Sequence, residues 1–417
     1  MIYFGKEVIR HGGRARAIRG DVFNGKGCGN VSIAEHNGKL LVSYRVCDYT
    51  FIGYRNKVTY DSRYMWTPSI NEFDVRFGSE NVIGELDTDT LDVLHQTQYL
   101  ENQDFGKYVW TGYEDVRIVS WDGRLFASAS KPYHYEDQRI PMCIAEIDDK
   151  TFEIVGEPFH ACIGECEKNW MPLVDIPYTY VYSTKPLQVV RVPALEDPSK
   201  KEVECLLNKE VENEFYKGST QVVSYKGHYI AMVHYNDRVV VNGMGEYRYY
   251  SRFIVWDENW NVVRMSEPFT FAGMSIEFAC GLCLHNDVVY VTFSVYDNAA
   301  FVLEMPVKFF DWFTGFGEEP VVFEAYHSSE NDFLLNCDKD REIIRMADFL
   351  HGNGNIQGSV SLYSDAAVKT ESKMLAEYAY MKVLTSIKDI KLPTSDIDYT
   401  IKLIAEDRVV DQLRNIV

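Results

Sequence analysis

The 417-residue chain has no excess of positive charge, since 42 Lys and Arg residues stand against 62 Asp and Glu, a formal net charge of -20. Sequence-independent binding to nucleic-acid phosphates needs a clustered basic surface, and anionic membranes attract the same kind of surface. The sequence also lacks a continuous apolar run of membrane-spanning length and an N-terminal apolar segment of signal-peptide length. These absences argue against nucleic-acid and membrane partners and predict a cytoplasmic protein.

Cysteine is too sparse and too scattered for a disulfide scaffold. The nine cysteines are an odd number in a long chain, which is typical of a reducing compartment. Cys280 and Cys283 form a lone C-x-x-C with no second pair at zinc-finger spacing, so we expect no metal site. The chain also has no Gly-rich phosphate fingerprint between a strand and a helix, which argues against a separate nucleotide-binding unit.

The sequence does contain recurring hairpin patterns. With 46% hydrophobic and 25% charged residues it can bury a large core, and apolar residues alternate on both sides of tight-turn sequences. Four such turns fall at Asn37-Gly38, Asp122-Gly123, Lys226-Gly227 and Asn286-Asp287, and a looser hairpin over 171–186 turns near Pro177. Five related strand pairs predict an all-β fold, a five-bladed β-propeller over residues 1–325. The alternatives are a β-sandwich or two stacked β domains.

After about residue 325 the pattern changes to apolar residues at three- and four-residue spacing. Three segments have this helical spacing, 331–350, 364–387 and 395–417, separated by the break 351–359 and by Pro393. Residues 326–417 are therefore predicted to form a helical extension. It would either cover part of the propeller or assemble the chain into a homo-oligomer.

Polar residues precede each predicted hairpin. In a propeller the innermost strands run the same way along a central axis, so their starts converge at one end. These polar openings are Gly29-Asn30, Glu114-Asp115, 167–170, 217–220 and Glu277-Phe278. We therefore expect them to form one site.

Asp115 is the strongest candidate for proton transfer. It lies next to Glu114 and two residues before Arg117, and neighbouring charges of both signs can tune the proton affinity of a carboxyl group. The structural alternative is an ion pair that fixes the end of a strand.

The remaining candidates fall into two groups. Hydrogen-bonding side chains that suit a sugar are Asn30, Arg45, Glu114, Arg117, Asn169, Trp170, Glu277 and Asp297, and side chains that suit an anion are Lys168, Lys185, Lys217, His234, Arg248 and Tyr250. Carbohydrate chemistry fits this inventory, since glycosidic cleavage needs a carboxylic acid near the leaving oxygen. Several candidates have structural alternatives: Trp170 as a core aromatic residue, Lys217 as a solvated lysine, and the lone acids as caps.

These motifs together resemble a known family. The sequences NVS (30–32), YEDVR (113–117), EKNWMP (167–172), KGST (217–220), His234, RYY (248–250), IEFACGL (276–282) and YDNAA (296–300) occur in this order. They are similar to motifs of the mannoside phosphorylases and β-mannosidases of glycoside hydrolase family 130 and the related mannosyltransferase-phosphorylases. The resemblance covers roughly residues 25 to 305 and does not extend to the helical segments.

The resemblance implies a five-bladed propeller and an inverting single displacement. Asp115 would protonate the departing oxygen, directly or through a sugar hydroxyl, while inorganic phosphate attacks the anomeric carbon. His234 and Tyr250 match the histidine and tyrosine of the family's phosphate site. The implied partners are an oligosaccharide or a sugar 1-phosphate, with phosphate as co-substrate and no cofactor.

Three alternatives remain open at this stage. A phosphate-independent hydrolase would need a second carboxylate, for which Glu167 and Glu277 are candidates. A glycosyltransferase that uses nucleotide sugars lacks its expected sequence fingerprint. A non-catalytic sugar-binding propeller would retain the same polar openings without turnover.

Overall fold

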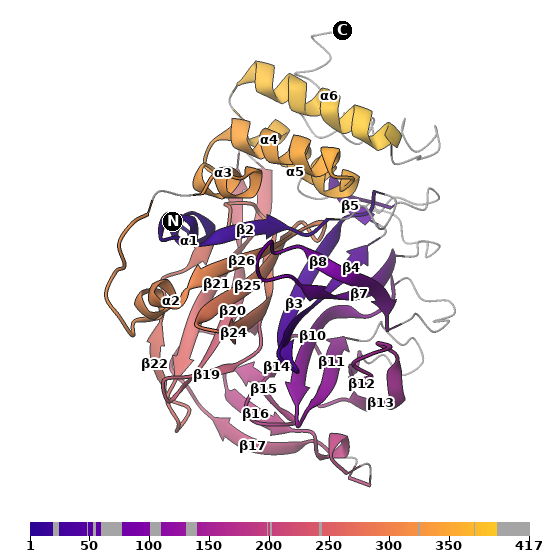
Figure 1. Cartoon of the computed structure of the whole chain (residues 1–417), viewed down its shortest axis with the longest axis vertical. Coiled ribbons are helices and arrows are strands. Elements are labelled where there is room, and N and C mark those ends of the chain that lie inside the picture. Colours follow the sequence, from indigo (N-terminus) through magenta and orange to yellow (C-terminus); the bar gives the residue numbers. More distant parts are fainter. Residues whose placement is uncertain are drawn as a thin grey trace.

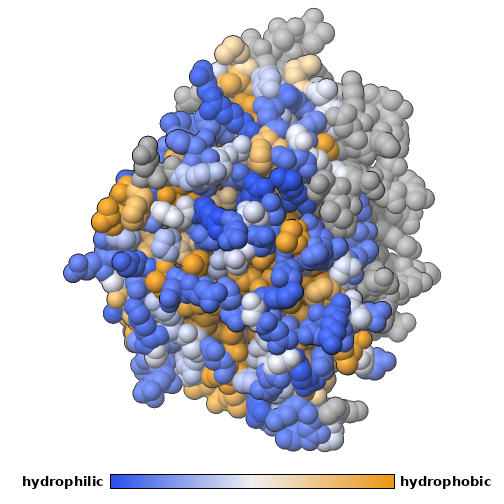
Figure 2. Space-filling view, viewed as in Figure 1, coloured by the Kyte–Doolittle hydropathy of each residue, from blue (hydrophilic) through white to orange (hydrophobic). Residues whose placement is uncertain are grey.

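The computed structural model describes residues 1–19, 25–47, 49–52, 56–59, 77–100, 110–130, 140–197, 199–200, 202–241, 244–323, 326–370 and 372–389 (Figure 1). Strands dominate up to about residue 306, and most helices follow them. No helix in these ranges has both the length and the apolar character needed to cross a membrane. On the face shown in Figure 2, hydrophilic and apolar residues are interspersed.

Four sheets have the four-strand path of a propeller blade. The first contains β3 (Cys28–His36), β4 (Lys39–Cys47), β7 (Phe77–Leu86) and β8 (Val93–Tyr99), with β9 (Trp110–Thr111) beside β7. The second contains β10 (Glu114–Trp121), β11 (Arg124–Ser130), β12 (Met142–Ile147) and β13 (Ile154–Ala161). The third contains β14 (Met171–Pro172), β15 (Thr179–Thr184), β16 (Leu187–Arg191) and β17 (Glu204–Lys209). The fourth contains β24 (Glu277–His285), β25 (Val288–Val295), β26 (Ala299–Pro306) and, from the start of the chain, β2 (Arg14–Ala17).

The remaining strands form a seven-stranded sheet and a small two-stranded sheet. The seven-stranded sheet contains β1 (Ile2–Tyr3), β18 (Lys217–Gly218), β19 (Val223–Tyr225), β20 (His228–Val241), β21 (Met244–Trp256), β22 (Val262–Met265) and β23 (Phe269–Thr270). The two-stranded sheet pairs β5 (Tyr49–Ile52) with β6 (Asn56–Thr59).

The sheets are arranged as a β-propeller. The strand β3 contacts both β10 and β24, while β10 contacts β14 and β24 contacts β19. The side chain of Gln221 forms hydrogen bonds to three of these strands, β3, β10 and β24. Its Nε2 donates to the carbonyls of Ile33 and Ile118, each at 2.8 Å, and its Oε1 accepts from the Leu282 amide at 3.1 Å. The predicted β-propeller with C-terminal helices is therefore confirmed, and its sheets surround a shared centre instead of stacking as two layers.

The predicted hairpin turns are confirmed because both central residues have the positive φ that type I′ turns require. The φ pairs are 51° and 77° at Asn37-Gly38, 52° and 71° at Asp122-Gly123, 49° and 74° at Lys226-Gly227, and 50° and 59° at Asn286-Asp287. The fifth hairpin pairs β14 with β15 over a longer connection. The local turn chemistry thus fixes where the strands reverse.

Apolar side chains fill the spaces between neighbouring sheets. One cluster joins Ile83 to Ile118 and Leu125, between the first and second sheets. The largest cluster joins Phe293 and Phe301 of the fourth sheet to the helices. The helical layer is therefore continuous with the core of the propeller.

The described helices are α1 (Phe4–Arg10), α2 (Val307–Thr314), α3 (Ser329–Leu335), α4 (Asp340–Gly352), α5 (Ile356–Lys369) and α6 (Lys373–Asp389), with a short 3-10 helix at Pro193–Leu195. The segment 331–350 contains parts of two helices where one was predicted. The helix α5 begins inside the predicted break 351–359, because the Asn355 side chain caps it by accepting from the Gly358 amide. The segment 395–417 lies outside the described residues. The division at residue 325 and homo-oligomerisation through the helices stay predictions.

Candidate functional site

The structure places Asp115 at the start of β10, where the backbone departs from regular strand geometry. Asp115 has a φ of 54°, and the β10–β11 register shifts between Glu114 and Arg117. Such a bulge redirects side chains at the end of a strand. Both carboxylates face Arg45, whose Nη1 lies 3.8 Å from Glu114 Oε1 and 3.4 Å from Asp115 Oδ1. Their side chains are 19% and 17% exposed, so both acids are accessible to solvent.

Asn30 holds the Asp115 carboxylate from the first sheet. Asn30 Nδ2 donates to Asp115 Oδ1 at 2.6 Å. Ser294 fixes the orientation of this amide, since its Oγ accepts from the Asn30 backbone amide at 3.0 Å and donates to Asn30 Oδ1 at 2.9 Å. Three sheets therefore contribute to the position of one carboxylate.

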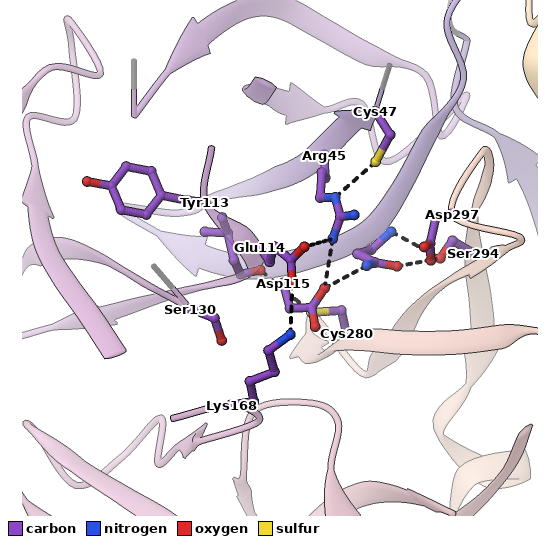
Figure 3. A network of polar contacts seen from close by, with 12 residues as sticks. Arg45, Cys47, Tyr113, Glu114, Asp115, Ser130, Lys168, Cys280, Ser294 and Asp297 are labelled. Atoms are coloured by element: carbon purple, nitrogen blue, oxygen red, sulfur yellow. Dashed lines mark hydrogen bonds and ion pairs between the residues drawn. The ribbon is translucent and has the colours of Figure 1, made fainter. Parts of the chain in front are cut away.

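Arg45 connects the acidic pair to Asp297 through Tyr49, and Figure 3 shows Arg45 between the two acids and Cys47. Its Nε donates to Cys47 Sγ at 2.9 Å and its Nη2 donates to the Tyr49 hydroxyl, which donates to Asp297 Oδ2 at 2.9 Å. Burial disfavours the charge of Arg45, but the neighbouring Cys47, Tyr49, Glu114 and Asp297 raise its pKa well above the ordinary value. Arg45 is therefore a permanent buried cation beside Asp115.

Lys168 adds a second cation on the other side of the acidic pair. Its Nζ lies 2.9 Å from Glu114 Oε2, and its side chain is 41% exposed. Burial disfavours its charge, yet Glu114 and then Asp115 raise the pKa of Lys168 above its ordinary value. In Figure 3 the lysine points toward the carboxylates from the loop before β14.

Arg117 is a buried connector between three strand openings. Its Nη1 donates to the Asp115 carbonyl at 2.9 Å, its Nη2 to Asn169 Oδ1 at 3.3 Å and its Nε to the Ser219 carbonyl at 2.6 Å. The side chain is 1% exposed. Arg117 therefore holds Asp115 and Asn169 in position by hydrogen bonds. Because the side chain is buried, this role differs from the predicted contact with substrate.

His234 lies beside this connector and is neutral at physiological pH. Burial, followed by the charges of Lys217 and Arg117, lowers the pKa of His234 to about 3. Its Nδ1 shares a hydrogen bond of 2.7 Å with Ser219 Oγ, and its ring stacks on Tyr249 at 5.8 Å. His234 can therefore offer a neutral hydrogen bond to an anion but no positive charge.

Tyr249, and not the predicted Tyr250, belongs to this group. Successive side chains of a strand point to opposite faces, and Tyr250 stacks on Tyr235 on the other face of the sheet at 5.2 Å. Burial raises the pKa of Tyr249, and the charges of Asp297 and Asp115 raise it further. The tyrosine that stacks on His234 is therefore the residue before the predicted Tyr250.

The described contacts place Arg248 near Tyr3, where burial raises the pKa of the tyrosine and the charge of Arg248 opposes that rise. Lys217 is exposed, pairs with His234 across β18 and β20, and acts on the pKa of that histidine. Lys185 is exposed in the turn between β15 and β16. Of the residues predicted to bind an anion, Lys168 is the one with a described ion pair to Glu114.

Glu277 and Trp170, which were predicted to bind a sugar, are buried residues that support the fold. Glu277 accepts from the amides of Phe271, Ala272 at 2.9 Å and Met274 at 2.8 Å, and it is 2% exposed. Trp170 is 0% exposed because it packs between Tyr180 and Tyr182, and no face is left for a sugar ring. The core alternative for Trp170 is therefore the correct one.

Glu167 is also occupied by the protein itself. Its carboxylate accepts from the amides of Ile163 at 2.5 Å and Gly164, and from Trp170 Nε1 at 3.0 Å. The side chain closes the loop before β14. Both acids that the sequence offered as a second carboxylate thus have their oxygens engaged by N–H donors.

Besides Tyr249, the sequence reasoning assigned no role to Tyr49 and Ser294, and it named Ser219 only as part of the opening 217–220. Tyr49, Ser294 and Ser219 each contact a predicted site residue. The signal available for Ser219 and Ser294 was their position at a strand opening or a strand end, whereas nothing local to Tyr49 indicated its contact with Asp297. Within the described residues, no cluster of three or more His, Cys, Asp or Glu side chains could hold a metal ion.

No protein-family model matches the chain, and no curated protein matches its sequence. Solved structures do match its fold. The β-1,2-mannobiose phosphorylase from Listeria innocua, in complex with β-1,2-mannobiose, is 16% identical with a TM-score of 0.44, over 70% of this chain and 91% of that chain. The mannose phosphorylase MPT-4 from Leishmania mexicana, in complex with a phosphate ion, is 12% identical with a TM-score of 0.44, over 73% of this chain and 90% of that chain.

A third structure comes from work on the GH130 family of mannoside phosphorylases, which contains glycoside hydrolases that target β-1,2 mannosidic linkages in Candida mannan. It is 13% identical with a TM-score of 0.43, over 72% of this chain and 87% of that chain. The chain is thus structurally similar over most of its length to GH130 mannoside phosphorylases and to glycoside hydrolases. The roles of individual residues rest on the contacts described above.

Proposed function

We propose that this protein is an inverting carbohydrate-active enzyme that acts on β-mannosides or similar glycosides, with Asp115 as general acid and inorganic phosphate as the nucleophile. In this proposal the seven-stranded sheet is the fifth blade of a five-bladed propeller. The starts of the innermost strands then surround the acidic pair.

One observation carries the proposal: Asp115 is a partly exposed carboxylate that side chains from distant parts of the chain hold in place. Asn30 Nδ2 contacts it at 2.6 Å and Arg45 Nη1 lies at 3.4 Å. Its main chain has the positive φ of 54° that is uncommon for a residue other than glycine. A side chain so constrained at an accessible strand opening is typical of a functional group.

The proposed step uses one proton and one anion. The carboxyl group of Asp115 gives its proton to the glycosidic oxygen, directly or through a sugar hydroxyl, as the bond from that oxygen to the anomeric carbon breaks. A phosphate oxygen forms the new bond to the anomeric carbon from the opposite face. The products are a sugar 1-phosphate of inverted configuration and an acceptor with a free hydroxyl, and the reverse reaction returns phosphate.

Two cations that could bind a phosphate dianion lie beside Asp115, and each also pairs with an acid of the site. Lys168 is accessible to solvent and remains charged, and Arg45 supplies a second positive charge beside the acids. The neutral imidazole of His234 and the Tyr249 hydroxyl offer hydrogen bonds without further charge. Cations and neutral donors together are the groups that bind phosphate in proteins.

Hydrolysis without phosphate is the second candidate, and its weaker point is the base. Besides the two acids that the sequence offered, Glu114 pairs with Lys168, and Asp297 accepts from Tyr49. An inverting hydrolase needs a carboxylate base to activate water. Glu167 and Glu277 accept from backbone amides and are 1% and 2% exposed, so neither is available as that base. An anionic nucleophile removes the need for a second carboxylate.

The test is to incubate the protein with mannose 1-phosphate and a panel of mannosyl acceptors and to measure phosphate release. We expect release that depends on the acceptor, and a glycoside product that phosphate converts back. Glycoside cleavage that proceeds at the same rate without phosphate would instead indicate a hydrolase. Sugar binding without turnover in either direction would indicate a non-catalytic sugar-binding propeller and contradict the proposal.

A further inference from the structure

The helix α5 packs against β5 and β26 of the propeller. Asn355, the residue that caps α5, also donates from Nδ2 to the Asn298 carbonyl at 2.9 Å. Gly358, in the first turn of α5, lies against the same residue, because a Cβ there would be 2.8 Å from the Asn298 carbonyl oxygen. Asn298 and Asn355 are 0% and 1% exposed. The contact is therefore close, polar and shielded from water.

Asn298 is connected to the side chains around Asp115 through Asp297 and Tyr49. It follows Asp297, which accepts from the Tyr49 hydroxyl at 2.9 Å, and its own Nδ2 donates to the Tyr49 carbonyl at 3.2 Å. Tyr49 in turn accepts from Arg45, the cation beside Asp115. A path of hydrogen bonds, joined through the covalent structure of Asn298 and Tyr49, thus runs from the cap of α5 to the proposed general acid.

Gln357 of α5 holds two further segments of the site. Its Oε1 accepts from the Gly27 amide at 2.6 Å and its backbone amide donates to the Gly25 carbonyl at 3.1 Å, just before β3 carries Asn30 into the site. Its carbonyl accepts from Thr50 Oγ1 at 3.1 Å, and Thr50 follows Tyr49. The segments that lead to Asn30 and Tyr49 are therefore both attached to α5.

The other end of α5 holds the loop that supports Tyr249. Asp365 accepts from the Tyr296 hydroxyl and pairs with Lys369 at 3.0 Å, and Lys369 donates to the Gly273 carbonyl at 3.4 Å. The carbonyl of Ser275, in this same loop, accepts from the Tyr249 amide at 2.9 Å.

We propose that α5 is the positioning element of the candidate site and that Asn355 is its principal positioning residue, acting through Asn298, Asp297 and Tyr49 on Arg45 and Asp115. The inference rests on the proposed function. It assigns to the helical extension a role in catalysis beyond covering the propeller. Buried polar contacts of this kind specify one geometry because an unpaired group in the same place is costly.

Asn355→Asp tests the proposal, because it keeps the oxygen that caps α5 but replaces the Nδ2 donor with an oxygen facing the Asn298 carbonyl. We expect kcat to fall about 10- to 100-fold through misplacement of Arg45 and Asp115, with a smaller change in KM. The effect should be much smaller in a Tyr49→Phe background, in which the series of hydrogen bonds is already broken. If N355D does not fold, Asn355→Ser, which retains a capping oxygen, is measured in the same way.

The matched control is Ser328→Ala, which removes the cap of α3, where Ser328 Oγ accepts from the Asn331 amide at 3.1 Å. S328A should lower thermal stability and leave kcat and KM unchanged. Equal kinetic effects of S328A and N355D, or an effect of N355D that simply adds to that of Y49F, would overturn the positioning role.

Amide hydrogen exchange separates this inference from the proposed function. N355D should accelerate exchange at residues 27–30 and 295–298, whereas S328A should not. A wild-type protein without turnover would defeat the proposed function but leave this exchange result intact. Unchanged exchange in N355D would overturn the positioning role whether or not the enzyme is active.

Discussion

Residues with a positive φ, mostly Asn and Asp, occur both at the turn end and at the site end of the propeller sheets. At the turn end, the first residues of four tight turns have positive φ, namely Asn37, Asp122, Lys226 and Asn286. At the site end, Asn30, Asp115, Asn169 and Asp297 also have positive φ, with values of 50°, 54°, 63° and 55°. The turn end is explained by hairpin geometry, which requires this conformation. Asp297 follows Tyr296 in the turn between β25 and β26, where the positive φ of both residues again fits hairpin geometry. Asn30, Asp115 and Asn169 lie near strand starts, where no tight turn requires this conformation.

The difference lies in what holds each residue. At the site end, register shifts interrupt β3 between Gly29 and Ser32 and β10 between Glu114 and Arg117. Gly29 allows the close approach of another segment, since a Cβ there would be 2.4 Å from the Asp297 carbonyl oxygen. At the turn end, a Cβ on Gly38 would meet nothing within 4 Å. Local sequence therefore determines one end, and contacts between sheets determine the other.

The largest expected effect comes from the same substitution at the two ends of one hairpin. Asp115→Asn should reduce turnover about 10²- to 10⁴-fold, because an amide cannot act as the general acid. Asp122→Asn should leave turnover unchanged, because Asn favours the same turn and keeps an oxygen acceptor for the Tyr178 hydroxyl, now at 3.0 Å. Steady-state rates and sugar binding by calorimetry measure both, and we expect D115N to retain binding. Full activity in D115N would remove Asp115 from the mechanism.

A second prediction concerns Glu277, a site-end acid that the protein itself occupies. Burial raises its pKa from 4.5 to about 7, so the folded state holds the proton more tightly than the unfolded chain does. The contribution of Glu277 to stability is therefore fully present below about pH 4.5 and is lost as the pH rises toward 7. Glu277→Gln does not titrate, and it leaves a buried amide N–H without its acceptor, at a cost of about 1–3 kcal/mol.

We therefore expect E277Q to be less stable than wild type at pH 5, with the difference shrinking as the pH approaches 7. Urea unfolding at several pH values measures this trend. Glu153→Gln is the control, since Glu153 is exposed in the turn before β13, and its stability should follow that of wild type at each pH. A difference between E277Q and wild type that stays constant with pH would contradict the role of burial.

The third prediction compares the two faces of β21. Tyr249→Phe removes the hydroxyl of the ring that stacks on His234 and should lower kcat/KM for phosphate about tenfold, the equivalent of one lost hydrogen bond to phosphate of about 1.4 kcal/mol. Tyr250→Phe should change it less than about twofold, because that ring stacks on Tyr235 on the other face. Initial rates at limiting phosphate decide between them. The opposite ranking would restore the original assignment of Tyr250.

The smallest effect is expected at the turn end. Gly38→Ala places a Cβ on a residue with a φ of 77°, a conformation that costs an L-residue about 1 kcal/mol, although no atom obstructs it. The free energy of unfolding should fall by about this amount, while kcat and KM stay at their wild-type values. A kinetic effect of G38A would mean that the two ends of the strands are coupled.

Parts of this fold and site follow from short stretches of sequence. The turns and the acidic pair at 114–115 could be predicted because neighbouring residues determine them. The sequence could not show that Tyr249, and not Tyr250, lies beside His234, because this depends on which residues of β20 pair with each tyrosine. The burial of Glu277 could not be predicted either, because its three backbone donors belong to residues 271–274, whose path is set by packing against the helices.

The sequence by itself determined the strand reversals, the helical character of the last described segments and the polarity of the strand openings, because each depends on residues a few positions apart. Tertiary structure alone decided which of those polar residues share a site. The Asn30–Asp115 hydrogen bond spans 85 positions of the chain, and the one between Tyr49 and Asp297 spans 248. Contacts at such separations exist only once the sheets and α5 have packed, since packing alone brings these groups within reach of one another.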